Sequence, residues 1–365
     1  MGRTVDKLQK ELQEQVFHYA KDSKKAAGRA LGTFVEIITY YKVAAWGFRN
    51  NILIERKVPE FGNPEITHNV EFSIHKSIMH RQLEMETPAG TLNARAIGKV
   101  GSFQPTRLNE VLLCSQRKLR NAAVLGEHRD YIAVANLDKH DSSTVTIDLN
   151  HLHPRPVAIF ECKRVGVEEG MKKGPQSIEK AKQGAYVAKT VSALQKVYGS
   201  KGEEIGYLSM DGGAVITKPY MDLYHDIVYG REPLPEGFVL SVGVTSNHGN
   251  WFTSENANKE LKVLAQAYDW LLFLTDHGLM AFVDECLLRP LPKYKAIRKA
   301  FLASYAGERG RNRFTKVKID LEAAHALLAY FEENRTRSDG WFEVISPKKQ
   351  TLSDLSRELN AVLVH

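Results

Sequence analysis

The sequence predicts an α/β fold, and three observations favour this class. Short apolar runs rich in Val and Ile, such as residues 156–160, have the composition of strands buried on both faces. Residues 178–198 place apolar side chains every three or four positions, as a helix packed on one side does. Between residues 105 and 247 a helix, several strands, a second helix and another strand are predicted in that order. This order is typical of one α/β core, to which we expect helical additions on both sides.

The composition is that of an ordinary globular protein large enough to bury a substantial core. The chain has 365 residues, of which 43% are hydrophobic and 25% are charged, and its formal net charge is +7. The positive charge is a mild indication of a polyanionic partner such as DNA.

Several classes are disfavoured by what the sequence lacks. No apolar run is long enough to span a bilayer, so we expect no membrane association. The N-terminal segment has no apolar core of the kind that secretory signals carry. Three widely spaced cysteines fit a reducing cytoplasm better than a disulfide framework or a cysteine-rich metal site. Gly98 and Lys99 lack the spacing of a phosphate-binding loop, so no nucleotide cofactor is expected.

The N-terminal part is predicted to consist of helices followed by two strands. Residues 4–48 are expected to be mostly helical, and 52–60 and 67–76 look like strands around a Phe-Gly-Asn-Pro turn. Pro105 favours the start of a helix, which the apolar spacing extends over 106–121.

The central part is predicted to hold most of the sheet. Strands are expected at 131–137, 143–149 and 156–163, a helix at 178–198 and a buried strand at 237–247. Helices are predicted to follow at about 256–274, 293–305 and 320–334. We therefore divide the chain into an N-terminal region for recognition or dimerisation (1–104), a core with insertions (105–285) and a helical C-terminal region (286–365).

The strand at 156–163 ends in an unusual way. Glu161 and Lys163 project to the same face, because side chains alternate along a strand, and no Gly or Pro separates them from the apolar run. The linker to the preceding predicted strand is too short for a parallel crossover, so the two strands should pair antiparallel. A turn centred near residues 152 and 153 would bring Asp141 beside Glu161 and Lys163.

Two other aspartates are alternatives to Asp141 at this site. Asp138 lies slightly earlier in the chain, whereas Asp148 would lie several residues away from Glu161 in the predicted hairpin. A solvated salt bridge between Glu161 and Lys163 at a strand end is the simplest competing interpretation.

Converging carboxylates at a strand end predict a divalent cation. Two such groups repel each other, and Mg²⁺ removes the conflict because carboxylate and carbonyl oxygens are its preferred ligands. The backbone carbonyl of Cys162 could supply a further oxygen. Lys163 could orient the metal-bound water or hold charge on a phosphate under attack.

His140 and Asp141, followed after a gap by Glu161, Cys162 and Lys163, resemble the catalytic signature of the PD-(D/E)XK nuclease superfamily. This is the fold of type II restriction endonucleases. In that superfamily the aspartate precedes a strand, and the glutamate and lysine end the antiparallel strand that follows. The predicted helices and strands around the motif come in the same order, so the resemblance covers roughly residues 105–250. His140 replaces the usual proline.

The resemblance implies a restriction-endonuclease-like core, in which helices flank a mixed central sheet, and Mg²⁺-dependent hydrolysis of DNA. Asp141, Glu161 and Lys163 would be catalytic, and Asp141, Glu161 and the Cys162 carbonyl would bind the metal. Glu110 is a candidate for an extra metal ligand. The expected protein is therefore a site-specific type II endonuclease acting on double-stranded DNA. A repair or mobile-element nuclease on the same core, and a non-catalytic DNA-binding protein that kept the fold, remain alternatives.

Two kinds of segment could contact the nucleic acid. Basic runs follow the predicted catalytic strand and occur again near residue 310, and a polar loop follows the strand at 237–247; a solvated surface is the alternative for each. The candidate residues are Lys172, Lys173, Asn247, His248, Asn250, Arg309, Arg311 and Arg313.

A homodimer is the expected assembly. One active site cuts one strand, so two copies related by a two-fold axis would give symmetric cleavage of a palindromic target. The apolar side chains of residues 5–48 are candidates for the interface, with burial in the chain's own core as the alternative.

Overall fold

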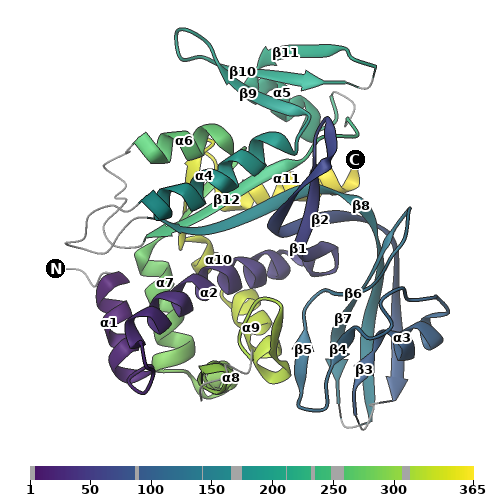
Figure 1. The fold of residues 1–365 in the computed structure, drawn as a ribbon, viewed down its shortest axis with the longest axis vertical. Coiled ribbons are helices and arrows are strands. Elements are labelled where there is room, and N and C mark those ends of the chain that lie inside the picture. The colour runs from purple at the N-terminus through teal and green to yellow at the C-terminus, as the bar shows by residue number, and fades with distance from the viewer. Residues whose placement is uncertain are drawn as a thin grey trace.

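The protein is arranged in three layers, with a mixed sheet between two layers of helices (Figure 1). The computed structural model describes residues 5–86, 90–141, 143–165, 175–210, 212–231, 235–247, 259–305 and 313–365. Among these residues, no helix combines the length and the apolar character that crossing a lipid bilayer requires.

The central sheet contains eight strands among the described residues. Its main path runs β1-β2-β8-β12-β13-β15, and β7 adds to β8 and β6 to β7. The pairs β8–β12 and β12–β13 are parallel and the others antiparallel, which confirms the predicted α/β class with a mixed sheet. The strands are β1 (Ile52–Glu60), β2 (Asn63–Glu86), β6 (Ala123–Glu127), β7 (Ile132–His140), β8 (Thr144–Val165), β12 (Leu240–Asn247), β13 (Trp270–Leu274) and β15 (Phe342–Ser346).

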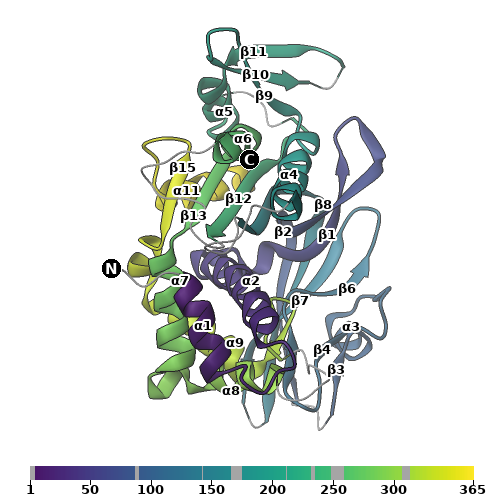
Figure 2. The ribbon, with the colours of Figure 1, turned by 60° about the vertical axis from the view of Figure 1, so that its left-hand side comes forward.

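Helices cover both faces of this sheet (Figure 2). On one face lie α2 (Ser23–Val43) and α11 (Leu352–Val364), whose apolar side chains join the main core. On the other lie α4 (Pro175–Thr190) and α6 (Lys259–Ala267). Helix α2 begins where the carboxylate of Asp22 accepts a hydrogen bond from the Lys25 backbone N–H, the usual N-cap contact.

An insertion between β2 and β8 forms a lobe at one end of the molecule. β2 and β8, 24 and 22 residues long, extend well past the helices and pair along most of their length. A second sheet of order β14-β5-β4-β3 lies in this lobe. Its elements, with the helix that follows β3, are β3 (Leu92–Asn93), α3 (Ala94–Gly101), β4 (Val111–Leu113), β5 (Lys118–Arg120) and β14 (Lys318–Asp320).

A three-stranded sheet and a group of helices complete the fold. The sheet of β9 (Leu194–Tyr198), β10 (Glu204–Ser209) and β11 (Val215–Pro219) packs on α5 (Tyr220–Val228). The remaining elements, most of which pack around α2 and α9, are α1 (Val5–Gln15), η1 (Ala44–Phe48), η2 (Arg49–Asn51), α7 (Asp276–Val283), η3 (Asp284–Leu288), η4 (Pro292–Tyr294), α8 (Lys295–Tyr305), α9 (Leu321–Glu333) and α10 (Arg335–Asp339).

Two sequence predictions about the strands before the motif are wrong. The predicted helix at 106–121 is replaced by β4 and β5, because Arg117 takes a left-handed φ of 57° that turns the chain between them. The predicted hairpin between 143–149 and 156–163 is instead the single strand β8. Pro154 and Pro156 fit inside it because the ladder to β2 is irregular there.

Later boundaries also differ. The helix predicted to reach residue 198 ends at Thr190, and the last part of the helix predicted at 256–274 is the buried strand β13. The central sheet takes β1 and β2 from the predicted N-terminal region and β15 from the predicted C-terminal region, so it crosses both proposed boundaries.

Candidate active site

Three glutamates lie in one row across neighbouring strands. In the β2–β8 ladder Phe72 pairs with Phe160, and in the β1–β2 ladder Ile54 pairs with Phe72. Glu71 and Glu161 lie one position beyond the Phe72–Phe160 pair, where the β2–β8 ladder ends, and Glu55 lies between Ile54 and Arg56, which pair with Phe72 and Val70. Like charges at directly opposed positions destabilise a sheet, so this row requires cations nearby.

Two lysines supply those cations. The Lys163 ammonium lies 3.2 Å from an oxygen of Glu161 and 3.9 Å from one of Glu71. The Lys316 ammonium contacts Glu71 and lies 3.1 Å from Glu36 of α2 and 3.2 Å from Glu55. The cluster therefore combines four carboxylates with two ammonium groups.

Glu161 is almost completely buried beneath an aromatic ring. Its exposed fraction is 4%, and Tyr268 packs over it in space left by two glycines. A Cβ on Gly243 would lie 2.8 Å from the Tyr268 ring, and one on Gly184 would lie 2.6 Å from the tyrosine oxygen. The small residues thus allow a large apolar group to exclude water from one side of the carboxylate.

This burial shifts the protonation equilibrium of Glu161. Desolvation raises the pKa of the Glu161 carboxyl, and the nearby Lys163 ammonium opposes that rise without cancelling it. Its Oε1 atom is buried and has no hydrogen-bond partner among the described residues. A buried acceptor in this state can accept a hydrogen bond from an ordered water or bind an ion.

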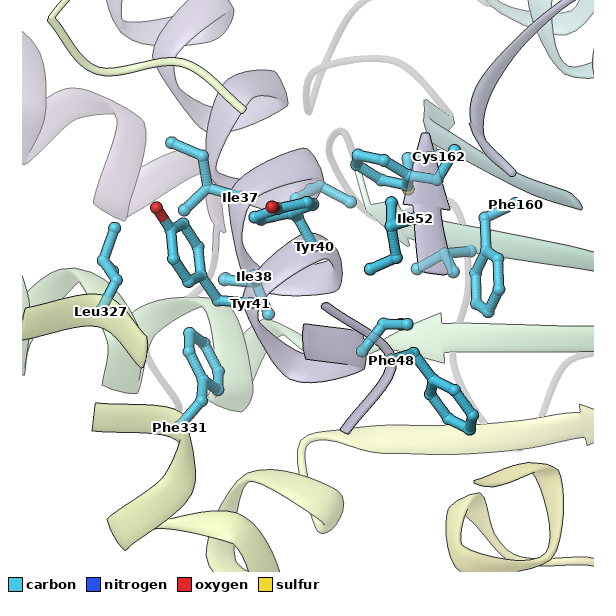
Figure 3. Close-up of a cluster of buried hydrophobic side chains, with 14 of the residues drawn as sticks. Ile37, Ile38, Tyr40, Tyr41, Phe48, Ile52, Phe160, Cys162, Leu327 and Phe331 are labelled. Carbon is cyan, nitrogen blue, oxygen red and sulfur yellow. The ribbon is translucent and has the colours of Figure 1, made fainter. Parts of the chain in front are cut away.

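The side chain of Cys162 points away from the glutamate row. It lies in the apolar cluster on the α2 side of the sheet, which also contains Ile52 and Tyr40 (Figure 3). Burial raises the pKa of its thiol well above the usual range. Its backbone belongs to the β8–β12 ladder, opposite Val244, and the role of its carbonyl as a metal ligand stays a prediction.

Asp141 does not lie beside Glu161, so that prediction is wrong. It occupies the turn between β7 and β8, twenty residues before Glu161 and at the opposite end of β8. Its carboxylate accepts hydrogen bonds from the backbone N–H groups of Ser143 and Thr144, at 2.8 and 2.7 Å. These bonds lower the pKa of Asp141 to about 2 and identify it as a turn-stabilising residue.

The alternative aspartates lie away from Glu161 as well. Asp138 near the end of β7 accepts a hydrogen bond from Gln82, and Asp148 accepts one from His80. The error has one physical cause: β7 ends at His140 and β8 begins at Thr144, so the chain reverses before Thr144 and not near residue 152, and β8 continues to Glu161.

Of the remaining predicted site residues, the structure describes Glu110, Asn247 and Arg313. Glu110 precedes β4 in the insertion and lies in no helix, and its carboxylate lies 2.7 Å from the Arg120 guanidinium, while its role as an extra metal ligand stays a prediction. Asn247 ends β12 four residues beyond Gly243, which pairs with Glu161, and the Asn247 amide donates to Asp276. Arg313 lies 3.8 Å from Asp320. The candidates outside the described residues are Lys172, Lys173, His248, Asn250, Arg309 and Arg311.

The cluster contains oxygen ligands of the chemical type that Mg²⁺ prefers. Glu71 and Glu161 offer carboxylate oxygens, one of which is the unpaired Oε1 of Glu161. Within the described ranges, no three His, Cys, Asp or Glu side chains are arranged as a metal-binding group. Instead, the ammonium groups of Lys163 and Lys316 lie between the carboxylates.

Sequence reasoning missed Glu36, Glu55, Glu71 and Lys316. One signal was available, because Glu71 interrupts the apolar residues Val70 and Phe72, just as Glu161 follows the apolar run 157–160 of its own strand. The pairing that unites them could not be inferred, since β2 and β8 are separated by the whole insertion.

Comparisons of the chain with models of protein families, with curated proteins and with solved structures yield no match.

Proposed function

We propose that this chain is a Mg²⁺-dependent DNA endonuclease of the type II restriction kind, with a core like that of the PD-(D/E)XK nucleases. The observation that carries the proposal is the convergence of Glu71, Glu161 and Lys163 at one end of the β2–β8 ladder. In this proposal Glu71 takes the role that the sequence suggested for Asp141. The order α2, β1, β2, β8, α4 and β12 around these residues supports the same core.

Glu71 and Glu161 are the residues that would hold Mg²⁺. The bound ion would supply Lewis-acid polarisation of a phosphate oxygen and acidify a coordinated water. The Lys163 ammonium lies beside both carboxylates, so it can orient the attacking water and stabilise negative charge on the phosphate. Tyr268 and the apolar packing behind Glu161 exclude solvent from the carboxylate, which strengthens its interaction with any cation.

The direct test is incubation of the protein with phage DNA and Mg²⁺. Discrete fragments are the expected result, and a Lys163→Ala preparation purified in the same way controls for contaminating nucleases. A smear would identify a non-specific nuclease and would contradict site-specific cleavage. Retained DNA binding without cleavage would support the non-catalytic alternative.

A further inference from the structure

Lys316 is an unusual residue to find at such a site. It lies outside the catalytic signature, and its side chain is 8% exposed although it carries a full charge. Burying an ammonium group is costly unless carboxylates surround it, and Glu36, Glu55 and Glu71 do so here. Lys316 is therefore the main counter-ion of the α2–β1–β2 side of the cluster.

The backbone of Lys316 is anchored independently of its side chain. The amide group of Asn121 donates to the Lys316 carbonyl at 2.9 Å, and the Asn121 backbone N–H donates to the carbonyl of Val317. Just beyond, β14 pairs with β5 of the insertion. The ammonium can consequently leave the carboxylates by rotation of its own four-carbon stem, while the chain remains in place.

Glu55 provides a route for this movement. Its φ of 53° lies in the left-handed region, which is unusual for a non-glycine residue inside a strand. Its side chain is 60% exposed, whereas that of Glu71 is 11% exposed. The carboxylates around Lys316 thus extend from the buried row towards solvent.

A divalent cation and the Lys316 ammonium would compete for the same oxygens. Lys316 contacts Oε1 of Glu71, a residue that would bind the metal, and two cations within a few ångströms repel strongly in a partly buried site. We propose that Lys316 is a built-in counter-ion, which holds the carboxylates together before metal binding and is displaced when a divalent cation binds at Glu71. This inference rests on the proposed function and adds a regulatory step to it.

Lysine labelling of the wild-type full chain tests the displacement directly. Reductive dimethylation followed by mass spectrometry would compare the modification rate of each lysine with and without saturating Ca²⁺. We expect Lys316 to be protected without the ion and to react at least ten times faster with it. Lys42, which is buried and paired with Asp339 at 2.6 Å, is the matched control and should not change.

A second measurement uses Lys316→Met, which keeps the apolar stem and removes the charge. Its melting temperature without divalent ions should be lower than that of the wild type, and its apparent Ca²⁺ affinity by thermal shift at least ten times tighter. Lys42→Met should also be destabilised, but without any gain in Ca²⁺ affinity.

The two ideas fail differently. If Ca²⁺ saturates the wild type while Lys316 stays protected, the displacement is wrong and the metal site stands. If neither the wild type nor Lys316→Met binds Ca²⁺, the metal site and the displacement are both wrong. If Lys316→Met does not fold, the labelling of the wild type decides alone.

Discussion

Glu71 and Glu161 lie one position beyond the Phe72–Phe160 pair that ends the β2–β8 ladder, and the ammonium group of Lys163 lies 3.9 and 3.2 Å from their carboxylates. Two acids at adjacent positions of one sheet face repel each other unless cations lie beside them. Here Tyr268 packs over Glu161, Lys163 lies beside both acids, and Lys316 contacts Glu71.

The exchange of roles between Asp141 and Glu71 can be tested with two isosteric substitutions. Glu71→Gln should reduce cleavage about 100-fold or more, because the amide cannot neutralise a divalent cation. Asp141→Asn should cleave normally, since an asparagine keeps the acceptor oxygen for the turn. Initial rates on plasmid DNA would compare them. Loss of activity in Asp141→Asn, with Glu71→Gln active, would restore the original assignment.

Lys163→Ala should separate catalysis from binding. The lysine contacts the two acids that surround the proposed reaction centre, so cleavage should disappear. DNA affinity should stay within a few-fold, because one lysine is a small part of a phosphate-contacting surface. Gel-shift titrations in Ca²⁺ would measure affinity without cleavage. An equal loss of both activities in a folded variant would contradict the catalytic role.

Glu161→Gln should make the protein more stable while abolishing cleavage. Burial raises the pKa of Glu161, so the charged form is disfavoured in the folded state above the ordinary pKa of a glutamate. Removing that charge should increase the free energy of unfolding by about 1–2 kcal/mol at pH 8 without divalent ions. The gain should vanish at low pH, where the carboxyl is protonated in both states. Urea unfolding would measure it.

Exposed Glu343 provides the control for that comparison. Glu343→Gln should change the free energy of unfolding by no more than about 0.5 kcal/mol at either pH. A destabilised Glu161→Gln protein at pH 8 would show that the carboxylate stabilises the fold.

Glu358 should make stability depend on pH near neutrality. It is buried in α11 and accepts hydrogen bonds from Tyr224 and Trp270, at 2.5 and 2.8 Å. Burial raises its pKa to about 7, so its stabilising contribution is complete below pH 4.5 and is lost as the pH rises through 7. The loss amounts to at most about 3 kcal/mol. Glu358→Gln should therefore have a flatter profile of unfolding free energy between pH 5 and 8, measured by urea titration. Parallel profiles would contradict the assignment.

We still predict a homodimer, but the apolar side chains of residues 5–48 no longer qualify as its interface. Phe17, Phe34 and Trp46 of the N-terminal segment are buried in the chain's own core, and Tyr19 donates a hydrogen bond to the Tyr305 carbonyl. Sedimentation velocity with and without DNA should show a dimer in at least one condition. A monomer in both that still makes double-strand breaks in one encounter would exclude it.

The sequence allowed prediction only of site residues that lie close together along the chain. Glu161 and Lys163 were identified because a charged pair at the end of an apolar strand is visible in nine consecutive residues. Their partner Glu71 was not, because Phe72 and Phe160 pair over a separation of 88 positions. Lys316 belongs to a basic run whose composition also fits a solvated surface. Its burial depends on three carboxylates from α2, β1 and β2, which no local pattern specifies.

The length of β8 has a consequence for the order of folding. His140 and Val145 pair across a short turn, so the β7–β8 hairpin can form early, whereas the end of the β2–β8 ladder at Phe72 and Phe160 closes a far longer loop. We expect the β2–β8 pairs to form in order from the insertion towards the glutamates. Glu71 and Glu161, which repel each other, would then stay apart until the last step. In pulsed hydrogen exchange, the amides near Val145 should gain protection before that of Phe160. The reverse order would mean that the charged end nucleates the sheet.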